Sequence, residues 1–90
     1  MFRDYLRSAA VSAHAAGTIT DDQLDTLELA TVFPRLTAGM ENIVVRRHAR
    51  DSGCTEAEAR KQLVKLTPQE WIDLIIKYLP ILLQILAMFV

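Results

Sequence analysis

Apolar and polar residues follow one another along the N-terminal segment with the period of an α-helix. Phe2, Leu6 and Ala9 recur every three or four positions, and charged residues occupy several of the positions between them. Gly17 comes next to the end of this pattern, and glycine readily adopts the left-handed conformation in which many helices stop. The pattern predicts a helix over residues 2–16, whose apolar stripe is built mostly of alanine.

Three further helix starts share the capping-box sequence, in which Ser or Thr at the N-cap is followed three residues later by Glu or Gln. The boxes begin at Thr20, Thr55 and Thr67, and Pro68 places a proline at the first helical position after the third box. Together with the apolar pattern, these signals predict helices over residues 21–33, 35–51, 56–66 and 68–90. No stretch alternates with the period of two that a half-buried strand requires, so we predict an all-α fold.

The last predicted helix is apolar around most of its circumference. At 100° per residue, one narrow polar stripe contains Asp73, Lys77 and Gln84. Asp73 and Lys77 are four residues apart, a spacing that favours an ion pair along the helix. Surface helices of globular proteins usually carry an apolar arc only a little wider than ~100°. We therefore predict a small bundle of about four short helices in residues 1–66, followed by a long and very hydrophobic C-terminal helix in residues 67–90.

A lipid bilayer is one environment that accepts such a helix. Residues 74–90 supply a span of 17 residues, about 26 Å as a helix, against a hydrocarbon core of ~30 Å. Trp71 and Tyr78 suit the membrane interface, and the Lys77 side chain can extend toward the headgroups. In this arrangement the N-terminal domain stays on the cytoplasmic side, because its central segment is basic.

Other copies of the chain are the second environment. Ile72, Leu79 and Leu86 recur every seven residues, which is the spacing of a coiled-coil seam. A helix lying flat on a membrane is a third option, although the polar stripe is thin for that role. The predicted membrane or oligomer interface comprises Trp71, Ile72, Ile75, Ile76, Leu79, Leu82, Leu83, Leu86 and Phe89.

Composition and charge narrow the classes of function. Hydrophobic residues make up 51% of 90 residues and the net charge is −1, which excludes intrinsic disorder. The single cysteine, Cys54, excludes an intramolecular disulfide framework. The N-terminal third is acidic and residues 35–65 are basic. Within the basic segment, Arg46, Arg47 and Arg50 form a basic patch suited to phosphate, anionic lipid or an acidic protein.

The sequence around Gly53 resembles the turn of a helix-turn-helix motif. Ala49 and Gly53 stand four residues apart, as that motif prefers, and the resemblance implies a DNA-binding module over residues 44–66. Its recognition helix would begin with Glu56 and Glu58, which phosphates repel. The other interpretation is a structural joint in which these acids pair with basic residues one turn later in the same helix. We therefore do not expect nucleic acid as the partner.

Residues able to support catalysis or metal binding are sparse. His14 and His48 lie 34 positions apart, and two ligands do not make a zinc site even if the turn brings Cys54 near His48. No Gly-rich phosphate loop and no nucleophile motif occurs. We expect no enzyme activity, no cofactor and no metal.

These expectations combine into one functional prediction with two alternatives. The chain is predicted to be a non-enzymatic structural or assembly protein, membrane-anchored and self-associating, as a phage virion or phage membrane component would be. The alternatives are a soluble homo-oligomer with the C-terminal helix buried between subunits, and the DNA-binding module. The expected partners are membrane lipid, other copies of the chain or a larger protein assembly. Because no signal peptide is apparent, we expect a membrane or a virion as the location rather than secretion.

Overall fold

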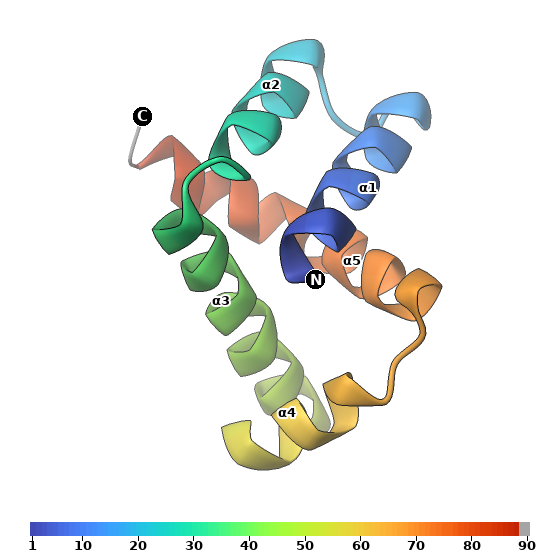
Figure 1. Cartoon of the computed structure of the whole chain (residues 1–90), viewed down its shortest axis with the longest axis vertical. Coiled ribbons are helices and arrows are strands. Elements are labelled where there is room, and N and C mark those ends of the chain that lie inside the picture. Colours follow the sequence, from blue (N-terminus) through green and yellow to red (C-terminus); the bar gives the residue numbers. More distant parts are fainter. Residues whose placement is uncertain (89–90) are drawn as a thin grey trace.

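The computed structural model describes residues 1–88 and folds them into five α-helices joined by short turns (Figure 1). The helices are α1 (Phe2–Ala15), α2 (Asp21–Ala30), α3 (Pro34–Ser52), α4 (Glu56–Val64) and α5 (Pro68–Ala87). The described residues contain no β-strand. The predicted all-α fold is therefore confirmed.

The helix starts follow the predicted capping residues. The Thr20 hydroxyl accepts a hydrogen bond from the Gln23 N–H at 3.2 Å, and the Gln23 side chain accepts one from the Thr20 N–H at 2.9 Å. Thr67 and Glu70 make the same reciprocal pair in front of α5. Hydrogen bonding of the Glu70 carboxylate to Thr67, first of all to its backbone N–H, lowers the pKa of the Glu70 carboxyl. At α4, the Thr55 hydroxyl accepts from the N–H three residues on. Each bond satisfies an amide that has no partner within its helix, which fixes where the helix begins.

The second and third helices are separated by a turn at residues 31–33, which the sequence pattern assigns to the second helix. α2 ends at Ala30 rather than at residue 33. Pro34 restricts the residue before it to extended conformations, and Phe33 has φ −109° and ψ 102°. Pro34 itself lies in the first turn of α3, where the hydrogen bond that it cannot donate is not needed. The turn at residues 31–33 therefore leaves the helical path and carries Val32 and Phe33 to the surface.

α1 and α5 pack against each other at the centre of the molecule. α1 also contacts α2 and α3, and α3 contacts α4 and α5. In Figure 1, α2 lies at one end of the longest axis, the α3–α4 hairpin turns at the other end, and α5 runs across the middle.

Two clusters of buried side chains form the core. The larger draws on α1, α2, α3 and α5, and its fully buried large members are Leu6, Leu27, Val44, Ile75, Leu79 and Leu82. The smaller lies between α3 and α4 and consists of Val45, Ala49, Ala59 and Leu63. Trp71 and Leu74 of α5 pack against both clusters. Residues before and after residue 66 thus contribute to the same core.

The alanine face of α1 explains how one side of α5 is covered. Ala9, Ala10 and Ala13 are buried, together with Phe2 and Leu6 on the same helix. Small side chains let two helix backbones approach closely, because the distance between packed helices depends on the side chains at their contact. The chain therefore buries one face of α5 by itself.

The predicted membrane span is not supported. No helix within residues 1–88 is both long enough and apolar enough to cross a bilayer. In α5, the charged residues Glu70, Asp73 and Lys77 interrupt the apolar sequence. Phe89 and Val90 of the predicted span lie outside the described residues.

The core position of Leu79, which is 1% exposed, predicts a large loss of stability on truncation. Leu79→Ala should lower the free energy of unfolding by about 2–5 kcal/mol, because it removes buried methyl groups and leaves a cavity. Gln84→Ala, at an exposed position of the same helix, should change it by less than about 0.5 kcal/mol. Urea unfolding followed by far-UV circular dichroism measures both, and equal midpoints would contradict the described packing of α5.

Candidate functional site

The side chains predicted to form a membrane or oligomer interface lie mostly in the core of the chain itself. The buried members are Ile75, Leu79, Leu82 and Leu86. The half-buried members, which pack against the same core, are Trp71, Ile72, Ile76 and Leu83. Phe89 lies outside the described residues. Two positions of the seven-residue repeat, Leu79 and Leu86, therefore have no surface left for a second copy.

Trp71 lies at the junction of the two core clusters. Its indole stacks on the Tyr5 ring, with centroids 5.9 Å apart and an interplanar angle of 20°. It also meets the Phe2 ring edge to face, at 6.0 Å and 76°. Such aromatic pairs contribute ~0.5–1.5 kcal/mol beyond their burial. These contacts hold the start of α5 against the start of α1.

The predicted polar stripe is exposed, but its charged members have partners other than each other. Asp73, Lys77 and Gln84 all lie on the surface of α5. Lys77 Nζ is 3.9 Å from Asp51 Oδ2 on α3. The Asp73 Oδ1 atom accepts a hydrogen bond from Gln69 Nε2 at 3.0 Å. Lys77 therefore connects α5 to α3, while Asp73 is bonded within α5, and these contacts replace the ion pair expected along the helix.

Asp51 also accepts a hydrogen bond from the buried Tyr78, at 2.5 Å from the phenol oxygen to Oδ2. Burial and the neighbouring carboxylate raise the pKa of Tyr78 to about 12, and the charge of Arg47 opposes part of this shift. Lys77 Nζ lies 5.4 Å from the centroid of the Tyr78 ring. The contact ties the last turn of α3 to the middle of α5. No sequence pattern indicated it, because its two partners are 27 positions apart.

The basic patch lies on the second half of α3, and its three arginines differ in their surroundings. Arg46 and Arg50 are exposed, whereas Arg47 is half-buried. Arg46 Nε is 3.2 Å from Glu56 Oε1 in the first turn of α4. Glu56 therefore pairs across the joint with α3, not with a basic residue one turn later in its own helix.

The joint between α3 and α4 is a tight turn centred on Gly53. This residue has φ 68° and ψ 31°, a left-handed conformation that glycine adopts without steric cost. The Cys54 N–H donates to the Ala49 carbonyl at 3.0 Å, which closes the end of α3. Ala49 and Ala59 are buried between the two helices. The first turn of α4, which would meet DNA in a helix-turn-helix protein, carries the acid Glu56.

Residues considered for catalysis or metal binding have different partners and surroundings. His14 Nε2 is 2.5 Å from Asp21 Oδ1, which joins the end of α1 to the start of α2. His48 Nε2 is 3.2 Å from Gln62 Oε1, and Cys54 is half-buried against the smaller core cluster. Within residues 1–88, no three His, Cys, Asp or Glu side chains are grouped so that they could hold a metal ion.

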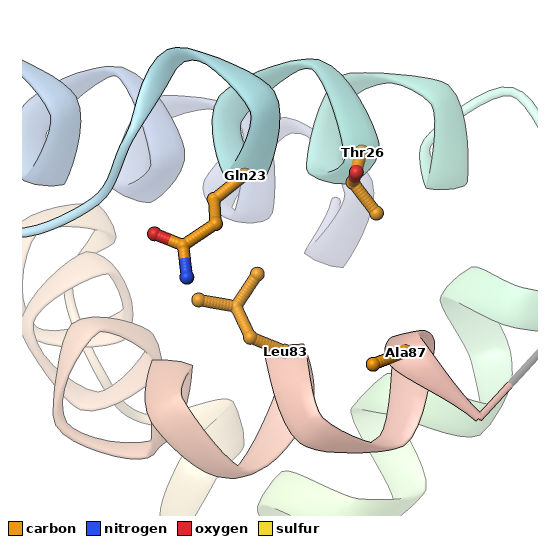
Figure 2. A pocket seen from close by; sticks show the side chains of 4 residues that line it. All are labelled: Gln23, Thr26, Leu83 and Ala87. Carbon is orange, nitrogen blue, oxygen red and sulfur yellow. The ribbon is translucent and has the colours of Figure 1, made fainter. Parts of the chain in front are cut away.

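A shallow hollow of about 350 Å³ lies between α2 and the C-terminal half of α5. Figure 2 shows Gln23 and Thr26 of α2 on one side of it, and Leu83 and Ala87 of α5 on the other. The Leu83 side chain points toward Gln23 across the opening. Because Leu83 is only half-buried and Ala87 is exposed, part of the apolar surface of α5 remains open here.

Three exposed apolar side chains gather where α2 turns into α3. Leu29 is 58% exposed, Val32 is 60% exposed and Phe33 is 49% exposed. We call these three residues the α2–α3 corner. Sequence analysis missed it because residues 21–33 were assigned to one continuous helix. The signal that locates the turn is Pro34, which disfavours a helical conformation at Phe33.

Comparison with known proteins finds no relative of this chain: no family model matches it, and neither the curated proteins nor the solved structures give a significant match. A functional assignment therefore depends on the surfaces of the molecule itself.

The raised pKa of Tyr78 predicts a loss of stability at high pH. A phenol ionises near pH 10 in an unfolded chain, and that of Tyr78 ionises at about 12 in the folded protein. The folded state holds this proton more tightly, so the stabilisation is complete below pH 10 and is lost as the pH rises through 12. Over this interval the free energy of unfolding should fall more steeply for the wild type than for Tyr78→Phe.

Tyr5→Phe is the matched control and should retain the steep fall. The chain has two tyrosines, so in this variant the absorbance of tyrosinate reports the titration of Tyr78 directly. An ionisation midpoint close to pH 10 would contradict the contact between Tyr78 and Asp51.

Proposed function

We propose that this chain is a non-enzymatic structural protein that assembles with other copies of itself. The observation that carries the proposal is the α2–α3 corner, where Leu29, Val32 and Phe33 are each about half exposed or more. Single exposed apolar residues are ordinary, but a group of them marks a surface that another molecule covers. α2 also forms one wall of the hollow lined by Leu83 and Ala87, so both open apolar features adjoin the same helix.

The apolar area of the α2–α3 corner determines how much free energy its burial contributes to association. Complete burial of a Leu, Val or Phe side chain contributes ~1.5–3 kcal/mol. Covering three side chains that are about half exposed therefore contributes about 2–5 kcal/mol. Association costs about 4–15 kcal/mol in lost translational and rotational freedom. The corner is thus the apolar centre of a contact, and neighbouring groups must complete it.

The charges of α2, the helix that leads into the corner, favour a protein over a lipid surface as the partner. α2 carries no Lys or Arg, and its four carboxylates are all exposed: Asp21, Asp22, Asp25 and Glu28. Anionic headgroups repel such a surface, because membranes attract basic segments. A second protein molecule can instead present cations beside its own apolar side chains.

Replacing Val32 and Phe33 together by Ser should weaken self-association by about tenfold or more. The change removes more than about 1.4 kcal/mol of apolar burial, which corresponds to a factor of ten in the association constant. Sedimentation velocity over a concentration series measures that constant, and circular dichroism verifies that the variant is folded.

Val11→Ser is the matched control, because Val11 is 50% exposed on α1 and lies outside the corner. This variant should associate like the wild type. A wild-type chain that remains monomeric at all concentrations, and floats with lipid vesicles, would refute self-assembly in favour of a lipid partner.

A further inference from the structure

The exposed face of α2 combines one large apolar side chain with carboxylates on both sides. At 100° per residue, Leu29 lies between Asp25 and Asp22 on the helix surface. All three side chains are exposed, and so is Glu28 on the last turn. An apolar centre with a charged rim is the usual layout of a protein contact surface.

The exposed face of α4 has the same layout with the opposite charge. Val64, which is 81% exposed, lies between Arg60 and Lys61 at 100° per residue. Both cations are exposed. Arg60 donates a hydrogen bond to Asn42 Oδ1 on α3 at 2.7 Å, which holds its guanidinium beside this face without neutralising its charge.

Neither face is neutralised within the chain. The ion pairs among residues 1–88 join His14 to Asp21, Arg46 to Glu56 and Lys77 to Asp51. In that part of the chain Asp22, Asp25 and Glu28 form no ion pair, and neither do Arg60 and Lys61. The charges that flank Leu29 and Val64 are therefore among those that have no ion-pair partner in this part of the chain.

The two faces cannot meet within one molecule. The longest extent of the molecule is 35 Å, and Figure 1 places α2 at one end of this axis and α4 at the other. Only a second molecule can bring a face like that of α4 against α2. A copy of the same chain carries such a face.

We infer that α2 of one copy binds α4 of the next, so that the copies assemble head to tail. This inference rests on the proposed self-assembly and names its surfaces. Leu29 contacts Val64 at the centre, and the carboxylates of α2 face Arg60 and Lys61. Such a contact joins two different patches, so a pair of bound copies still has one free α2 face and one free α4 face. The assembly then grows as an open chain or closes into a ring. Because the rim is charged, high salt weakens the contact.

A charge swap tests this contact directly. The α2 reversal is Asp25→Lys with Glu28→Lys, and the α4 reversal is Arg60→Glu with Lys61→Glu. Each reversal alone sets like charges against each other and should weaken self-association at least tenfold. An equal mixture of the two variants should restore association, because the reversed face of each matches a face of the other. A single chain with all four changes should also associate.

A reversal elsewhere on the surface is the matched control. Asp4→Lys changes an exposed charge on α1 and should leave association unaltered. Circular dichroism of each variant separates loss of contact from loss of fold. Sedimentation velocity of each variant and of the mixture gives the association constants.

The outcomes separate this inference from the proposed function. If the wild type associates and neither reversal weakens it, the copies meet through other surfaces; the head-to-tail contact is then wrong and self-assembly stands. If both reversals weaken association but the mixture does not restore it, α2 and α4 do not bind each other, and the inference is again overturned. If the wild type is monomeric at every concentration, both proposals fail.

Discussion

The packing of α1 on α5 is the contact on which the rest of the structure depends. α5 is the most apolar helix of the chain, and it would expose a continuous apolar face without a neighbour. The small side chains of Ala9, Ala10 and Ala13 let α1 lie close to α5. The alanines bury little area themselves. Their contribution is geometric, because they bring the larger side chains Phe2 and Leu6 into the same core as Leu79 and Leu82.

The α3–α4 hairpin is held on this central pair by two different kinds of contact. Trp71 and Leu74 pack against the smaller core cluster on one side and the larger on the other. The hydrogen bond from Tyr78 to Asp51 then fixes the end of α3 on α5. A hydrogen bond to a charged group contributes ~1.5–3 kcal/mol, a large share of the 5–15 kcal/mol by which a small domain is stable. This polar contact therefore adds to the apolar packing of Trp71 and Leu74 in holding the hairpin on α5.

Local features of the sequence predicted much of the fold, and features that depend on the whole chain could not be predicted. The helix starts at Thr20 and Thr67 were predicted because capping involves residues only three positions apart. The environment of α5 was not predicted, because the sequence of an apolar helix face is the same whether that face packs against lipid, another copy or the rest of the chain. The partner of Lys77 was also missed, because Asp51 comes near it only after α3 and α5 have packed together. The candidate surface was partly visible, as an acidic α2 and a basic middle segment, but the exposure of Leu29 and Val64 depends on which side of each helix the core occupies.

The position of Trp71 has a practical consequence. It is the only tryptophan of the chain, it stacks on Tyr5, and it contacts both core clusters. Its fluorescence therefore responds to two separate unfolding events, which other probes would average. Separation of α1 from α5 removes the energy donor Tyr5 from the indole. Opening of the α3–α4 hairpin exposes the indole to water. A single intrinsic chromophore can thus reveal whether this small protein unfolds in one step or loses its hairpin first.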